Sequence, residues 1–160
     1  MRNKSKTLIF VIIILLIAAD QLSKHLLIKY FHNDGAEIIL LPFVSIVYLW
    51  NRGVSFGMFA KLEYSNYIFM AFAIIITSVL SYLLLRTKKK LEIVSYCLII
   101  SGAVGNIIDR ILYGAVFDFI YFHVGEFHWP AFNIADSVIS IGVMFLIINF
   151  IYYEKQGELK

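Results

Sequence analysis

Four long stretches of almost uninterrupted apolar residues alternate with segments that carry most of the polar residues. A helix needs about 20 apolar residues to cross a hydrocarbon core about 30 Å thick, because each residue adds about 1.5 Å. We therefore expect four membrane-spanning helices, at about residues 7–27, 67–85, 91–112 and 134–152. The whole chain, residues 1–160, is expected to form a single integral membrane domain.

The segments between the spans at about residues 31–65 and 113–133 have a different pattern. Residues 43–50 are rich in β-branched and aromatic side chains and run into Asn51-Arg52-Gly53, which is typical of a strand entering a turn. Residues 116–124 form a second strand-like run before a turn signal at Gly125. The predicted fold is therefore a four-helix membrane bundle with a small β-sheet and loop cap at the outer interface.

Composition agrees with a membrane protein and excludes other classes. Hydrophobic residues make up 61% of the chain, against roughly 45–50% in an ordinary soluble domain, so the excess must face lipid. Cys97 is the only cysteine, so the chain can form no internal disulfide and no cysteine-based metal site. The formal charge of +3 is not arranged as a basic stripe with interleaved aromatics, and we expect no nucleic-acid partner.

The distribution of lysine and arginine predicts the orientation. Most of the 14 basic residues lie in the N-terminal tail, at residues 86–90 and in the C-terminal tail, whereas the two strand-bearing segments hold only Arg52 and Lys61. Because basic residues favour the cytoplasmic side, both termini are expected there and the strands outside. The first span is interpreted as an uncleaved anchor, since Ile17 is a poor match for the small residue expected before a cleavage site.

Ionisable and amide side chains in three of the spans converge at one depth. Counted at about 1.5 Å per residue, they fall in the outer third of the membrane, where both strand-bearing segments enter. These residues are Asp20, Lys24, Asn106, Asp109, Arg110 and Asp136. Because charged groups are costly in lipid, their convergence predicts a buried polar site near the outer face.

Structural roles can also account for these residues one by one. Asp20 and Lys24 are four positions apart and could pair on one helix face. Arg110 could extend to the interface, or pair with Asp109 or a lipid phosphate. Asp136 lies three residues after Asn133, which is the spacing of a helix cap.

Two aspartates, Asp118 and Asp136, suggest acid–base hydrolysis of a peptide bond. Asp118 and Asp136 are separated by a single outer loop, so the two side chains can meet. Two adjacent carboxyl groups share one proton, which leaves one as a general base for water and the other as a general acid for the leaving amine. Such a dyad hydrolyses peptides without a metal, and we expect no metal or other cofactor.

Other hydrolytic chemistries fit the sequence less well. His123 and His128 could hold zinc, but they lack the spacing of a helical H-E-x-x-H site. A serine–lysine hydrolase could use Ser23 and Lys24, but adjacent residues on a helix point in different directions.

A four-span proton or ion carrier is the main alternative function, with the same acids forming a relay. Carriers usually place their sites near the bilayer midplane and often show internal repeats. Here the inner halves of the spans carry no acid or base at residues 8–19, 67–85 and 93–108, so a relay would have no continuation.

Five short blocks resemble the signature motifs of the bacterial lipoprotein signal peptidases, signal peptidase II. In chain order they are DQLSK at 20–24, NRGVSFG at 51–57, GAVGNIIDR at 102–110, VFDF at 116–119 and FNIAD at 132–136. The resemblance implies an intramembrane aspartyl endopeptidase of the bacterial cell membrane. It would remove signal peptides from diacylglyceryl-modified prolipoproteins, cutting before the lipidated cysteine.

The resemblance also implies site residues and partners. It assigns catalysis to Asp118 and Asp136. Supporting or substrate-binding roles fall to Asp20, Lys24, Asn51, Gly53, Asn106, Asp109, Arg110 and Asn133. Expected partners are prolipoprotein signal peptides, membrane lipids and globomycin-type inhibitors, and we expect a monomer.

The predicted orientation can be tested by cysteine labelling. Cysteines placed at Asn66 and Gly125 should react with a membrane-impermeant thiol reagent on intact cells, and one at Lys89 only after the membrane is opened. The parent chain, whose single thiol is Cys97, supplies the background signal. Labelling at position 89 on intact cells would reverse the topology.

Overall fold

Four long helices form the body of the protein, and the expectation of four long apolar helices is confirmed. The computed structural model describes residues 3–31, 37–53 and 64–157. The helices are α1 (Asn3–Tyr30), α2 (Ser65–Arg86), α3 (Lys90–Tyr113) and α4 (Ile134–Gly157). Each contains a segment long and apolar enough to cross a membrane. Their outward side chains are mostly exposed and apolar, as expected for surfaces that face lipid.

Helix α3 is the centre of the bundle and contacts each of the other three helices. Two glycines allow close packing around it. A methyl group at Gly102 would lie 2.4 Å from the carbonyl oxygen of Ala135 on α4, and one at Gly105 would lie 2.6 Å from Oδ2 of Asp20 on α1. Small residues at membrane helix interfaces permit such close backbone approach. These glycines therefore bring α1 and α4 against the same stretch of α3.

The small sheet has four antiparallel strands in the order β1-β2-β3-β4. They are β1 (Glu37–Leu41), β2 (Val44–Asn51), β3 (Val116–Val124) and β4 (Phe127–His128). The two predicted strands correspond to β2 and β3. Strand β1 was not predicted, because its sequence EIILL lacks the alternation of apolar and polar residues that marks a half-buried strand. It forms by pairing with β2 as an exposed edge.

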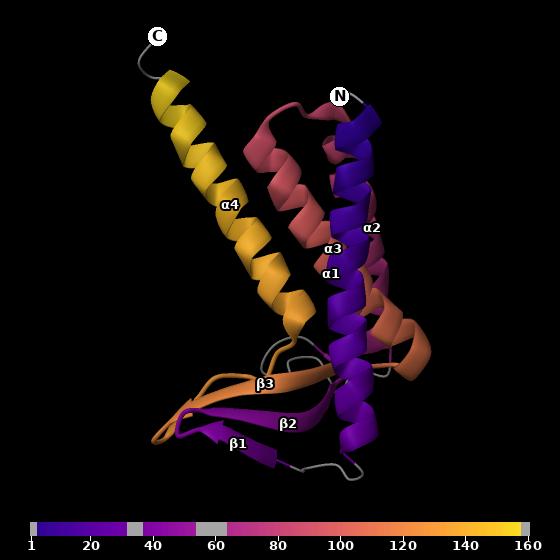
Figure 1. Ribbon diagram of the computed structural model, residues 1–160, viewed down its shortest axis with the longest axis vertical. Coiled ribbons are helices and arrows are strands. Elements are labelled where there is room, and N and C mark those ends of the chain that lie inside the picture. The colour runs from indigo at the N-terminus through magenta and orange to yellow at the C-terminus, as the bar shows by residue number, and fades with distance from the viewer. Residues whose placement is uncertain (1–2, 32–36, 54–63, 158–160) are drawn as a thin grey trace.

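The sheet lies across one end of the bundle, and both chain ends lie at the other (Figure 1). The connection between α2 and α3 lies at the same end as the termini. From the sheet end, α4 is inclined to α1 and packs along α3 (Figure 1), as far as Asn149, whose Nδ2 donates to Oε1 of Glu92 in the first turn of α3. Strands β2 and β3 therefore bring the carboxyl end of β2 and the start of β3 over the ends of the helices where the polar residues of the spans lie.

Candidate active site

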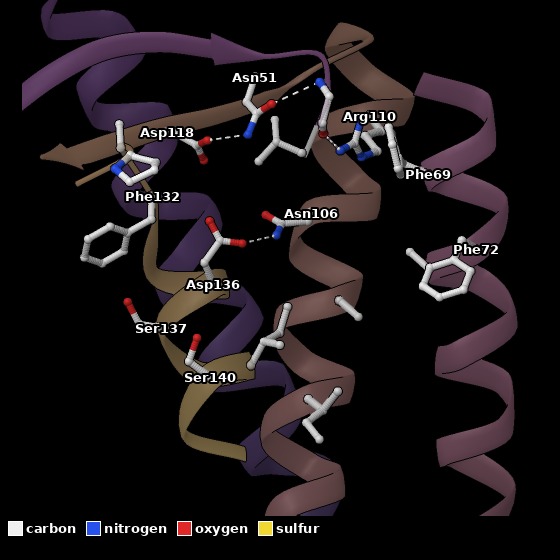
Figure 2. Close-up of a pocket in the computed structure, with 18 of the residues that line it drawn as sticks. Asn51, Phe69, Phe72, Asn106, Arg110, Asp118, Phe132, Asp136, Ser137 and Ser140 are labelled. Carbon is white, nitrogen blue, oxygen red and sulfur yellow. Dashed lines mark hydrogen bonds between the residues drawn. The ribbon is translucent and has the colours of Figure 1, made fainter. Parts of the chain in front are cut away.

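A cavity of about 740 Å³ opens beneath the sheet between α2, α3 and α4. Its end at the sheet is polar, with Asn51, Arg110, Asp118 and Asp136 in the wall, and Asn106 follows on α3. Farther along the helices the wall is mainly apolar, and Ser137 and Ser140 of α4 are its polar members (Figure 2). This apolar part includes Phe69, Phe72, Ala73, Ile76, Ile99, Ala103 and Ile139. Figure 2 shows the carboxyl groups of Asp118 and Asp136 directed into the same space at the polar end.

Strand pairing positions Asp118. It is the third residue of β3 and pairs with Leu49 of β2, and its side chain is only 1% exposed. Oδ2 accepts a hydrogen bond from Nδ2 of Asn51 at 2.9 Å, and Oδ1 accepts one from Nδ2 of Asn133 at 2.8 Å. Asn51 is itself held by the backbone N–H of Gly53, which donates to its Oδ1. Two neutral amides therefore hold both oxygens of this carboxyl group.

Asp136 occupies the first turn of α4, where it forms the predicted helix cap. Its backbone N–H donates to Oδ1 of Asn133 at 2.9 Å, and the backbone N–H of Asn133 donates back to Oδ2 of Asp136 at 3.2 Å. The other carboxylate oxygen, Oδ1, accepts a hydrogen bond from Nδ2 of Asn106 at 2.8 Å. Asp136 thus caps a helix and lines the cavity at the same time.

The environment of Asp118 favours its protonated form. Burial raises the pKa of Asp118 to about 7, and the nearby negative charge of Asp136 acts in the same direction. Hydrogen bonds from Asn51 and Asn133 and the positive charge of Lys24 lower this pKa by smaller amounts. At neutral pH, one carboxyl group at this end of the cavity can therefore carry a proton.

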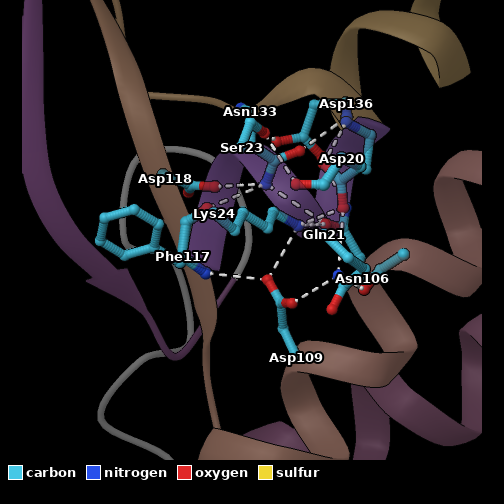
Figure 3. Close-up of polar contacts among 12 residues, drawn as sticks. Asp20, Gln21, Ser23, Lys24, Asn106, Asp109, Phe117, Asp118, Asn133 and Asp136 are labelled. Carbon is cyan, nitrogen blue, oxygen red and sulfur yellow. Dashed lines mark hydrogen bonds and ion pairs between the residues drawn. The ribbon is translucent and has the colours of Figure 1, made fainter. Parts of the chain in front are cut away.

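Behind the cavity, Lys24 is buried in a cluster of charges (Figure 3). Its ammonium group lies 2.8 Å from Oδ2 of Asp20 and 2.8 Å from Oδ2 of Asp109. The expected pairing of Asp20 with Lys24 is confirmed. Asp20 also accepts the backbone N–H of Ala135 on α4, and Asp109 accepts that of Phe117 on β3. The cluster therefore ties α1 and α3 to both elements that carry the cavity carboxylates.

Arg110 does not pair with Asp109, which was one of the roles that the sequence left open for it. Its guanidinium group donates to the carbonyl oxygen of Gly53 at 2.9 Å and to Oδ1 of Asn66 at 3.2 Å. Asp109 is turned toward Lys24 instead. Arg110 thus holds the chain just after β2 against the start of α2, at the rim of the cavity.

The residues of the alternative hydrolytic chemistries are engaged elsewhere. His123 shares a hydrogen bond with the hydroxyl of Ser45, and His128 with that of Tyr121, on the face of the sheet. Within residues 3–31, 37–53 and 64–157, no three His, Cys, Asp or Glu side chains are grouped to hold a metal ion. The Ser23 hydroxyl donates to the carbonyl oxygen of Asp20, so Ser23 and Lys24 form no pair.

Gln21 is a member of the polar cluster that the site prediction missed. Its Nε2 donates to Oδ1 of Asp109 at 2.9 Å, to the carbonyl oxygen of Gly105 at 3.1 Å and to Oδ2 of Asp20 at 3.2 Å. A polar residue next to Asp20 in an apolar span was the signal that could have identified it. The aromatic wall on α2, formed by Phe69 and Phe72, carries no such signal, because apolar residues are common throughout the span.

Comparisons with known proteins identify the chain's relatives. Residues 12–152 match the family model described as signal peptidase (SPase) II. A lipoprotein signal peptidase of Anaplasma marginale (strain Florida) is 43% identical over 153 residues, which cover 95% of this chain and 89% of the relative. A lipoprotein signal peptidase of Thermodesulfovibrio yellowstonii is 46% identical over 142 residues, which cover 89% of this chain and 92% of the relative. A solved structure of a bacterial membrane enzyme superimposes with a TM-score of 0.81 at 30% identity, covering 91% of this chain and 88% of that one.

The raised pKa of Asp118 predicts a stability that depends on pH. A carboxyl group of the unfolded chain titrates near pH 3.9, so between about pH 4 and pH 7 the folded protein holds a proton that the unfolded chain has released. The resulting stabilisation is complete below about pH 4 and is lost as the pH rises through about 7. Relative to Asp118→Asn, the unfolding temperature of the wild-type protein in detergent should therefore fall between about pH 5 and pH 8.

A matched variant separates this effect from general pH sensitivity. Glu126→Gln alters an exposed acid at the β3–β4 turn and should leave the wild-type pH dependence unchanged. A constant difference in unfolding temperature between wild type and Asp118→Asn across this pH range would contradict the raised pKa.

Proposed function

This chain belongs to the signal peptidase II family, and we propose that Asp118 and Asp136 are the catalytic carboxyl groups with which it cleaves its substrates. Membership of the family makes it a multi-pass membrane protease that removes signal peptides from prolipoproteins. The observation that carries the proposal is the presence of both carboxyl groups at the polar end of one cavity.

The proposed reaction needs one ionised and one protonated carboxyl group. The ionised group accepts a proton from a water molecule as the water oxygen attacks the scissile carbonyl carbon, and the protonated group donates to the leaving nitrogen. Asp118, with a pKa of about 7, supports a shared proton at neutral pH. The shared proton belongs to the pair, so the two carboxyl groups can exchange roles.

The shape and composition of the cavity support a signal peptide as the substrate. A signal peptide crosses the membrane as an apolar helix, and the apolar wall formed by α2, α3 and α4 offers it a matching surface. A helix hides its carbonyl groups in hydrogen bonds, so the chain must unwind at the cleavage point. The polar end, with Asn51 and Asn106 beside the carboxyl groups, offers partners to the exposed backbone.

Binding selectivity needs more than apolar contact. A peptide helix gains little by moving from lipid into an equally apolar groove. We therefore propose that the diacylglyceryl group on the cysteine after the scissile bond anchors the precursor, with Trp129 and Phe132 at the cavity rim near its acyl chains. Cleavage would then occur just before this cysteine. A cyclic peptide inhibitor such as globomycin would occupy the same space.

The proposed orientation places this cleavage near the outer face of the membrane. Both termini and the basic connection between α2 and α3 lie at the end of the bundle opposite the sheet, which supports a cytoplasmic position for that end (Figure 1). The cavity opens between helices of a single chain, so a monomer is sufficient for this function.

The two carboxyl groups can be tested by substitution. Asp118→Asn and Asp136→Asn should each lower kcat by at least about 1,000-fold, because each removes one half of the acid–base pair. The measurement is cleavage of a lipidated precursor by purified variants whose unfolding temperatures show that they are folded. Glu37→Gln, an exposed acid on β1, is the matched control and should keep wild-type activity. Near-normal turnover by either aspartate variant would remove that residue from the reaction.

The lipid requirement can be tested with the wild-type protein. A precursor with an unmodified cysteine, or with serine in its place, should be cleaved with a kcat/KM at least about 100-fold lower, which is about 2.7 kcal/mol of lost transition-state stabilisation. Lipidated and unlipidated forms of one precursor are compared in the same detergent. Equal kcat/KM values would mean that the lipid is not recognised.

A further inference from the structure

Lys24 has no hydrogen-bond donor left for a substrate. Its side chain is 2% exposed, and its ammonium group contacts Oδ2 of Asp20, Oδ2 of Asp109 and Oδ1 of Asn106, the last at 3.1 Å. An ammonium group has three N–H donors and no acceptor. All three donors are used within the protein, so any effect of Lys24 on the reaction must pass through one of these partners.

Asn106 is the partner that reaches the cavity. Its Oδ1 accepts from Lys24 and from Nδ2 of Asn133, the latter at 3.2 Å, while its own Nδ2 donates to Oδ1 of Asp136. The two ends of a carboxamide have nearly the same shape, so its partners determine which end faces which way. Because Lys24 can only donate, it can face only the amide oxygen, and the N–H groups must then turn toward Asp136.

We propose that Lys24 is a positioning residue for the cleavage reaction, acting by fixing the orientation of the Asn106 amide. The inference rests on the proposed roles of Asp118 and Asp136. With the amide reversed, its oxygen would face Oδ1 of Asp136, and two acceptors can approach only when the carboxyl group carries a proton between them. Fixing the amide therefore keeps Asp136 free to lose its proton when the dyad activates water.

The same orientation extends to the second carboxyl group. The oxygen of Asn106 also accepts from Nδ2 of Asn133, and this nitrogen donates to Oδ1 of Asp118. The backbone N–H of Asp136 also donates to Oδ1 of Asn133, so the cap fixes Asn133 and Lys24 orients Asn106 in agreement with it, and these two amides together contact both carboxyl groups. Asp20 and Asp109 hold the ammonium group at the position from which it does so.

A double-mutant cycle on kcat tests the proposal. Lys24→Met should lower kcat by about 10- to 100-fold while KM changes less than about threefold, because substrate contacts are retained. Asn106→Ala should lower kcat comparably. In the double variant Lys24 has no amide left to orient, so kcat should lie within about threefold of the slower single variant. Lys29→Met, an exposed lysine on the same helix, is the matched control and should leave kcat unchanged.

A second background covers the case in which Lys24→Met does not fold, since it leaves two buried aspartates without a counter-charge. Lys24→Met/Asp109→Asn removes one positive and one negative charge together, and the same cycle is then measured against Asp109→Asn alone. Folding of every variant is checked by its unfolding temperature. If Lys24 had only a structural role, Lys24→Met would lower the unfolding temperature, and its effect on kcat would not depend on whether Asn106 is present.

The outcomes separate this inference from the proposed function. A multiplicative loss of kcat in the folded double variant, an unchanged kcat in Lys24→Met, or a rise in KM alone would each overturn the positioning role. An inactive wild-type protein, or one whose turnover survives Asp118→Asn and Asp136→Asn, would instead contradict the proposed dyad.

Discussion

The structure depends on one buried ammonium group and the two carboxylates that neutralise it. A charge in the hydrocarbon region is expensive unless it is paired, so Lys24 can be buried only if Asp20 and Asp109 are brought to it. Each of these carboxylates also accepts a backbone N–H, from Ala135 at the start of α4 and from Phe117 at the start of β3. Neutralising one lysine therefore fixes the positions of the two segments that carry the cavity carboxyl groups.

Neutral amides separate this charged cluster from the proposed dyad. Asp118 and Asp136 receive side-chain hydrogen bonds from Asn51, Asn106 and Asn133, none of which carries a net charge. A lysine in direct contact with either carboxyl group would favour its ionised form strongly. Amides orient the carboxyl groups while permitting a pKa of about 7 at Asp118, which a shared proton requires. Because the amides orient the two carboxyl groups without adding a positive charge beside them, one carboxyl group can keep the proton that the proposed acid–base chemistry needs.

In the proposed function, the apolar length of the cavity binds the substrate and its polar end carries out the chemistry. Its apolar length resembles the surrounding lipid, so it can accept a helical peptide without strongly preferring it. In the proposed function, discrimination comes from the polar end, where Arg110 holds the carbonyl oxygen of Gly53, and from Trp129 and Phe132 in the cavity wall. An apolar groove of modest affinity is compatible with release of the cleaved signal peptide back into the membrane.

Sequence alone was sufficient for the features that depend on local properties. The four spans follow from the length of each apolar run, strands β2 and β3 from their β-branched and aromatic residues, and the cap formed by Asn133 and Asp136 from a spacing of three. The depth of the polar residues, counted along each helix, placed the site at the sheet end. Strand β1 was not predicted, because it forms by pairing with its neighbour β2 and its own sequence lacks a strand pattern.

The choice of partners across the bundle needed the folded structure. Asp109 and Arg110 are adjacent in sequence and opposite in charge, yet one turns to Lys24 and the other to Gly53. Successive residues on a helix point about 100° apart, and the rotation of α3 about its own axis determines what each one meets. That rotation is set by the close packing at Gly102 and Gly105, a property of three helices together. A linear sequence specifies which charges must be neutralised, whereas the packing of the helices selects the atoms that neutralise them.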